Sequence, residues 1–205
     1  MSAGLLPLIR EALARIPANE SRLGVMVSGG FDSSLLLYYL LREVGTGRLR
    51  VFTVPRPDGA LVHARRLTPV VCEMAGCNTI APIPVGNPSL HHSMQTFSGI
   101  VQVLRENWVD YLLLAENVTP NDPDLKGDPW APGRFRSKDR RMIQPFFDLT
   151  KDQLIAAAFA DGLERLLMES HSCTERTQGR CGRCWQCRER AWAFARIDRV
   201  DPGLN

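Results

Sequence analysis

Long apolar runs are missing from this chain of 205 residues, and none approaches the length of a membrane span. No signal peptide is visible, and Ser2 stands where N-myristoylation requires glycine. A strong charge of one sign is missing too: the formal net charge of +3 is too small to indicate nucleic acid or an anionic membrane as a partner. We therefore expect a cytoplasmic protein that binds neither a membrane nor nucleic acid.

Two common phosphate-binding motifs, G-x-x-x-x-G-K-[ST] and G-x-G-x-x-G, are absent from residues 23–41. Residues 28–34 instead read Ser-Gly-Gly-Phe-Asp-Ser-Ser, between an apolar run at 23–27 and a helical pattern of leucines at 35–41. This order indicates a buried strand, a tight loop and a helix. A glycine-rich turn without any ligand is the alternative interpretation, because α/β proteins contain many such turns.

The residue types in this loop suit phosphate groups. Gly29 and Gly30 have no Cβ, so backbone N–H groups there can surround an anion, and the following helix adds the positive end of its dipole. Asp32 offers a carboxylate where Mg²⁺ would bridge it to the phosphates. Further donors are the hydroxyls of Ser28, Ser33 and Ser34. The loop therefore predicts a phosphate site with Mg²⁺ beside Asp32.

The rest of the chain alternates strands and helices. Apolar content of 44% and charged content of 23% are ordinary for a soluble globular protein, and the length fits one domain over residues 1–205. The alternation predicts an α/β fold: an open, Rossmann-like parallel sheet with helices on both faces and ligands at the carboxyl ends of the strands. The expected elements are helices at 5–16, up to 44, at 63–75, at 95–108 and from Thr150, and strands at 23–27, 49–54, 78–85 and 110–115.

Four cysteines near the end of the sequence follow the pattern C-x7-C-x2-C-x2-C. Two-residue gaps let consecutive thiolates reach one metal, and four thiolates make a closed tetrahedral Zn²⁺ site. Gly182 relieves the tight turn, while the arginines at 180, 183 and 188 favour the thiolate forms. Disulfides and redox cysteines are the alternatives, and Cys72 and Cys77 are interpreted as ordinary thiols. We predict a structural zinc segment at about 170–190 with the ligands Cys173, Cys181, Cys184 and Cys187.

Positive charge gathers in two stretches, at residues 134–141 and 173–199. A solvated basic face is the plain interpretation of each. The first stretch ends the segment 116–141, which has no periodicity and is typical of a functional or disordered loop. We expect this segment to be mobile without ligand and to close over bound nucleotide, with Arg134 and Arg136 neutralising phosphate charge.

Three groups of residues resemble a known family. Ser28-Gly29-Gly30-Phe31-Asp32-Ser33 resembles the S-G-G-x-D-S signature of the PP-loop ATP pyrophosphatases, whose fold is that of the adenine nucleotide alpha hydrolases. Pro145, Leu149, Thr150 and Lys151 are similar to a Pro-x-x-x-Leu-Thr-Lys segment of the QueC enzymes of the queuosine pathway. Those enzymes also end in Ser-Cys, then Cys-Gly-x-Cys-x-x-Cys and a basic helix, as this chain does from Ser172 to Phe194.

The resemblance implies a function. QueC enzymes use ATP to adenylate 7-carboxy-7-deazaguanine, add ammonia to form an amide, and dehydrate the amide to a nitrile. Related proteins found with antiviral defence genes use the same activation to join a deazaguanine to a protein amine. By resemblance, Lys151 contacts phosphate here, although an exposed lysine in a first helical turn is the alternative. We expect an enzyme that requires ATP and Mg²⁺ and transfers a deazaguanine-type carboxylate to ammonia or a protein amine.

The sequence also departs from the QueC pattern. The family's Pro-x-Arg-Asn segment is replaced by residues 93–98, and its Tyr-Pro-Asp-Cys-Arg segment by residues 119–124. The helix at 5–16 is not typical either. These segments contribute to the substrate end of the family's pocket, so the resemblance supports ATP use more strongly than the identity of the substrate.

Two further functions stay open at this point: a PP-loop enzyme that modifies tRNA, with the basic tail holding the RNA, and a non-catalytic zinc module. The oligomeric state is open too, a homodimer included. No general base stands out, because the four histidines are scattered along the sequence and each is interpreted as a structural or surface residue.

Overall fold

A computed structural model describes residues 4–17, 21–122, 125 and 136–203. Within this part, five short strands form one sheet in the order β3-β2-β1-β4-β5, and every neighbouring pair is parallel. The strands are β1 (Leu23–Met26), β2 (Leu49–Thr53), β3 (Ile83–Pro84), β4 (Tyr111–Leu113) and β5 (Met142–Ile143). The chain order reverses on either side of β1, and a ligand crevice forms at such a point in open parallel sheets.

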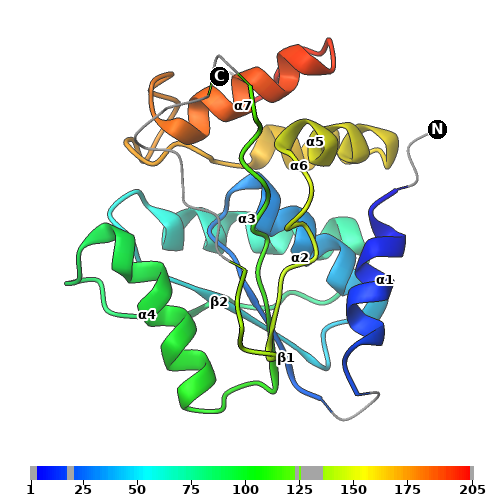
Figure 1. Cartoon of the computed structure of the whole chain (residues 1–205), viewed down its shortest axis with the longest axis vertical. Helices are drawn as coiled ribbons and strands as arrows, with labels where there is room; N and C mark the ends of the chain where they lie inside the picture. The colour runs from blue at the N-terminus through cyan, green and yellow to red at the C-terminus, as the bar shows by residue number, and fades with distance from the viewer. Residues whose placement is uncertain (1–3, 18–20, 123–124, 126–135, 204–205) are drawn as a thin grey trace.

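Helices cover both faces of this sheet (Figure 1). Val25 and Val27 belong to one apolar cluster together with α2 and α3, whereas Met26 belongs to a second cluster with residues of α4. The two-residue period of a strand explains this division. The helices are α1 (Leu6–Ala14), α2 (Phe31–Val44), α3 (Ala60–Ala75), α4 (His92–Arg105), α5 (Lys151–Ala160), α6 (Glu164–Glu169) and α7 (Trp185–Arg196). The predicted α/β fold is confirmed.

Two strands differ from the expectation. The third strand covers only Ile83–Pro84 instead of residues 78–85, since Pro82 and Pro84 have no N–H to donate to a ladder and proline is confined to sheet edges. The apolar run that resumes at 143 belongs to a fifth strand, β5, which pairs with β4 through Leu113 and Ile143. β5 is the edge strand beyond β4, and α5 follows it in the chain.

Helix α5 begins as the sequence predicts. Thr150 is the N-cap residue, and its backbone N–H donates to the Gln153 side chain at 2.9 Å. Lys151 is therefore the first residue of the helix, which fixes the direction of its side chain. In Figure 1, α5 and α7 lie side by side beyond α2.

One arginine of the basic tail is part of the interior and not of a solvated face. Arg190 is 1% exposed, and its guanidinium forms two 2.8 Å contacts to the Asp201 carboxylate. It also donates to the hydroxyl of Ser170 at 2.8 Å and to the carbonyl of Leu167 at 2.7 Å. This buried cluster fastens α7 to α6 and to the segment after α7. No helix in the described ranges is long and apolar enough to cross a membrane.

Candidate active site and metal centre

The glycine-rich loop connects the end of β1 to the start of α2, at the carboxyl edge of the sheet. Gly29 has a φ of +76°, and a Cβ at this position would lie 2.4 Å from the Cβ of His63. Only glycine suits such a conformation at such a close approach. The helix behind the loop has Gly30 as its N-cap residue and Asp32 in its first turn. The predicted order of strand, tight loop and helix is confirmed.

Serine hydroxyls hold the loop in shape. The Ser33 hydroxyl accepts from the Ser28 N–H and donates to the Gly30 carbonyl, each at 3.2 Å. The Gly30 N–H donates to the Ser28 hydroxyl at 3.3 Å. Ser34 differs from its neighbours, because its side chain is fully buried in α2 and does not line the cavity beside the loop.

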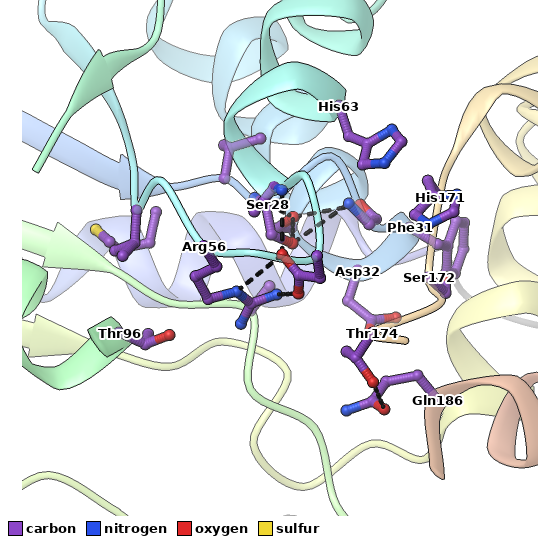
Figure 2. Close-up of a pocket in the computed structure, with 18 of the residues that line it drawn as sticks. Ser28, Phe31, Asp32, Arg56, His63, Thr96, His171, Ser172, Thr174 and Gln186 are labelled. Atoms are coloured by element: carbon purple, nitrogen blue, oxygen red, sulfur yellow. Dashed lines mark hydrogen bonds and ion pairs between the residues drawn. The ribbon is translucent and has the colours of Figure 1, made fainter. Parts of the chain in front are cut away.

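A cavity of about 390 Å³ lies beside this loop. Figure 2 shows side chains from several segments around it, including Ser28 and Asp32 of the loop, Arg56 after β2 and Gln186 of α7. Lys151 and residues 171–174 complete the wall near the cysteine segment. The cavity thus joins the loop, the first residue of α5 and the cysteine segment, which are far apart in the sequence.

Lys151 is buried against two carboxylates. Its ammonium forms an ion pair with the Asp32 carboxylate and lies 3.3 Å from an oxygen of Glu189, a residue of α7. Burial lowers the pKa of Lys151, but the two carboxylates outweigh it and raise the pKa above its ordinary value. The other Asp32 oxygen, Oδ1, is buried with no hydrogen-bond partner among the described residues. An unpartnered buried carboxylate oxygen fits a hard cation such as Mg²⁺.

Two histidines meet at the loop, which the sequence did not indicate. The rings of His63 and His171 stack with centroids 3.9 Å apart, and the His171 backbone N–H donates to the Gly29 carbonyl at 2.9 Å. Burial, together with nearby His171 and Arg66, lowers the pKa of His63, so its imidazole is neutral near pH 7. The stack joins α3, the loop and the segment that leads to the cysteines.

Other polar residues of the cavity also escaped the sequence analysis. Arg56 pairs with Asp58 at 2.5 Å just after β2, and Glu116 follows β4. Burial raises the pKa of Glu116 even though Gln144 donates to it. A rule could have selected them: in parallel sheets, side chains just beyond the carboxyl ends of the strands line the ligand crevice.

The four cysteines come together as predicted, since their sulfur atoms all lie within 4.8 Å of one another. Two of them, Cys181 and Cys187, have sulfurs 4.0 Å apart. A tetrahedral zinc with bonds of about 2.3 Å would require about 3.8 Å, so the donor set fits Zn²⁺. Gly182 has a φ of +73°, which confirms its role in the turn.

Backbone N–H groups donate hydrogen bonds to these sulfurs. Those of Arg183 and Cys184 donate to the Cys181 sulfur at 3.4 and 3.2 Å. The guanidinium groups of Arg180 and Arg183 are paired with the carboxylates of Asp201 and Glu175, and both also interact electrostatically with cysteines of the cluster. Burial raises the pKa of the Cys184 thiol, but hydrogen bonds from the backbone of Thr174 and Cys187 oppose this and the pKa is about 7.

The predicted lid over residues 116–141 lies partly outside the described residues, and Arg134 is among those outside. Arg136 is described: its guanidinium pairs with Asp148 at 2.8 Å and lies 4.2 Å from the ring centre of Phe147. It does not line the cavity.

One family model matches part of the chain. The model of the family described as "Queuosine biosynthesis protein QueC" matches residues 132–198, which is less than half of the chain. The matched part contains Lys151, Glu189 and all four clustered cysteines. No curated protein matches the sequence.

Solved structures with a similar arrangement include three enzymes. The U34-tRNA thiolase NcsA from Methanococcus maripaludis, with its [4Fe-4S] cluster, is 16% identical, with a TM-score of 0.49 over 95% of this chain and 71% of that one. The NH₃-dependent NAD synthetase from Campylobacter jejuni subsp. jejuni is 12% identical, with a TM-score of 0.49 over 78% and 72%. The phosphoadenylyl-sulfate reductase from Candida auris is 11% identical, with a TM-score of 0.44 over 78% and 80%.

Proposed function

We propose that the chain is a QueC-type PP-loop ATP pyrophosphatase that activates the carboxylate of 7-carboxy-7-deazaguanine, or of a close analogue, as its acyl-adenylate. The observation that carries this proposal is the meeting of three elements at one cavity. These are the Ser-Gly-Gly-Phe-Asp-Ser loop, Lys151 and the segment that begins at Cys173. The QueC match supports it independently, because it covers the second and third of these elements.

The proposed reaction has two steps. A carboxylate oxygen of the substrate attacks the α-phosphorus of ATP, and the bond to the β-phosphate breaks to release pyrophosphate. A nitrogen nucleophile then attacks the acyl carbon, loses a proton and expels AMP. Ammonia would give the amide, and dehydration of that amide would give the nitrile; a protein amine would give a conjugate.

Residues of the loop would hold the phosphates through their N–H and hydroxyl groups, with Ser28, Gly29, Gly30 and Ser33 as the set, while the buried Ser34 would support the loop from within α2. Asp32 would hold Mg²⁺ through its unpartnered oxygen, and that ion neutralises phosphate charge when bound. Lys151 adds a buried positive charge beside the same phosphates. Arg134 and Arg136 are proposed as further phosphate contacts, and Arg136 would have to leave Asp148 to serve.

The zinc site would act as a structural part of the cavity. Four thiolates leave no open coordination position, so no substrate reaches the metal. Thr174 and Gln186, which flank ligands of this site, line the cavity and are hydrogen-bonded to each other at 3.0 Å. A folded zinc segment would therefore set the shape of the substrate end.

Product mass spectrometry tests the proposal. The protein is incubated with ATP, Mg²⁺, 7-carboxy-7-deazaguanine and ¹⁵N-labelled ammonia, with Asp32→Asn as the matched inactive variant. We expect AMP, pyrophosphate and a ¹⁵N-labelled amide or nitrile from the parent only. A deazaguanine adduct on a co-expressed protein would assign the acceptor as a protein amine. Salt-sensitive tRNA binding with sulfur or nitrogen transfer to the RNA, or no ATP consumption with any carboxylate, would contradict the proposal.

A further inference from the structure

Glu189 forms a buried charge cluster with Asp32 and Lys151. The side chains of Lys151, Asp32 and Glu189 are 9%, 21% and 6% exposed, and the ammonium contacts both carboxylates. Asp32 and Lys151 line the cavity, whereas Glu189 does not and approaches Lys151 from α7 behind it. The cluster therefore contains two carboxylates for one ammonium.

A second buried carboxylate beside one ammonium is costly to hold in its charged form. Burying a carboxylate without full compensation destabilises a fold, and apolar residues usually replace such groups without loss. The nearby cation Arg190 is hydrogen-bonded to Asp201, a carboxylate that it shares with Arg180, and it also attracts Asp32 electrostatically without contacting Glu189. A single carboxylate would neutralise Lys151, so the second one needs its own explanation.

We propose that Glu189 is a positioning residue that keeps the Lys151 ammonium directed at the phosphates when the Asp32 carboxylate turns to a nucleotide-bound divalent cation. The inference rests on the proposed function. In the structure, Asp32 is paired with Lys151. If Asp32 is engaged elsewhere, Glu189 remains as the counter-charge of a lysine that is otherwise buried away from water.

Removing the charge of Glu189 should weaken cation binding without lowering the stability of the fold. In Glu189→Gln, Lys151 and Asp32 form a neutral pair with no second carboxylate to take over the lysine. Asp32 is then held more tightly by Lys151 and is harder to recruit to a cation. The variant should need more Mg²⁺ for nucleotide binding, while the nucleotide-free fold should be as stable as the parent because Lys151 keeps the Asp32 carboxylate as its partner.

The experiment compares the parent with Glu189→Gln, Glu189→Asp and the control Glu175→Gln. Glu175 is a carboxylate of the same cysteine segment that pairs with exposed Arg183 and contacts Cys181 outside the cavity, so it controls for the loss of a charge near the zinc ligands. Zinc content, nucleotide-free melting temperature and binding of a non-hydrolysable ATP analogue at varied Mg²⁺ are measured for each protein. For Glu189→Gln we expect full zinc, a melting temperature equal to or above that of the parent, and a Mg²⁺ requirement at least ten-fold higher. Glu189→Asp should restore part of the affinity, and Glu175→Gln should resemble the parent.

Two results would overturn the inference: an unchanged Mg²⁺ requirement in Glu189→Gln, or a loss of zinc and melting temperature that accompanies the weaker binding. A parent protein that binds no nucleotide would contradict the proposed function instead. The charge cluster has its own test without nucleotide. Lys151→Met should lower the melting temperature by leaving two unpaired carboxylates, and adding Glu189→Leu should recover most of that loss. Absence of this recovery would also count against the role of Glu189.

Discussion

The glycine-rich loop at residues 28–34 and the cysteine cluster at residues 173–187 are both short motifs, but their polar groups are arranged differently. The four sulfurs lie within 4.8 Å of one another and form a closed donor set. The loop instead borders a cavity of about 390 Å³, where one Asp32 oxygen has no partner in the described residues. A closed set stabilises a fold, whereas an open one is prepared for a ligand.

The two motifs are nevertheless connected by direct contacts between their residues. Glu189 of α7 contacts Lys151, which pairs with Asp32 of the loop. His171, two residues before Cys173, donates to the Gly29 carbonyl. Losing the metal should therefore disturb the loop, whereas losing a charge in the loop should leave the metal in place. Four substitutions test this difference between the loop and the cysteine cluster.

The largest effect is expected for Cys184→Ser. Removing one of four thiolates should release zinc and cost on the order of several kcal/mol of folding free energy, because metal binding is coupled to folding. Metal analysis and denaturant unfolding measure both quantities. Cys77→Ser is the control: this thiol is half-buried and outside the cluster, so zinc should be retained and stability should change by about 1 kcal/mol or less. If Cys184→Ser loses zinc but unfolds like the parent, the metal is not structural.

Asp32→Asn should have the next largest effect, on activity and not on the fold. It removes the charge at the proposed cation site with almost no change in volume, and we expect AMP formation to fall at least about 100-fold, or about 3 kcal/mol of barrier. Zinc content should equal that of the parent. Turnover of ATP at the parent rate would show that Asp32 does not hold the cation.

Gly29→Ala should have a smaller effect, on both the stability of the fold and nucleotide binding. A methyl group would lie 2.4 Å from the His63 Cβ at a φ of +76°, so the loop must shift, at a cost of about 2 kcal/mol. Nucleotide binding should weaken with it. Gly76→Ala is the control: Gly76 has a φ of +70° in the left-handed region, but a Cβ there would meet nothing within 4 Å. Equal destabilisation by both substitutions would mean that backbone conformation alone, and not contact with His63, constrains Gly29.

His63→Asn should give the smallest effect, seen only in the dependence of stability on pH. The pKa of His63 is lowered in the folded protein, so between that value and the unfolded value near 6.5 the unfolded chain binds more protons. Stability from this group is present above about pH 6.5 and is lost as the pH falls below it. Melting temperatures between pH 7.5 and 5.5 should therefore fall less in the variant than in the parent. Equal slopes would contradict a depressed pKa.

The sequence was sufficient to predict the features that depend on residues close together in the chain. The strand, loop and helix around Gly29 and the zinc ligands around Gly182 follow from local spacing and backbone freedom, and both were predicted. The Lys151–Glu189 contact and the His63–His171 stack were not predicted, because each joins segments that only the tertiary fold brings together. Glu189 was hardest to find, since a single acid in a basic helix gives no sign that it is buried.

The central claim is that the open loop cleaves ATP between its α- and β-phosphates to activate a carboxylate. The most direct measurement is ³¹P NMR of ATP and Mg²⁺ with the zinc-loaded protein, in the presence and absence of 7-carboxy-7-deazaguanine. We predict AMP and pyrophosphate in the parent, formed faster when the carboxylate is present, and neither product in Asp32→Asn. Release of ADP and orthophosphate, or AMP formation that is the same in Asp32→Asn, would contradict this account.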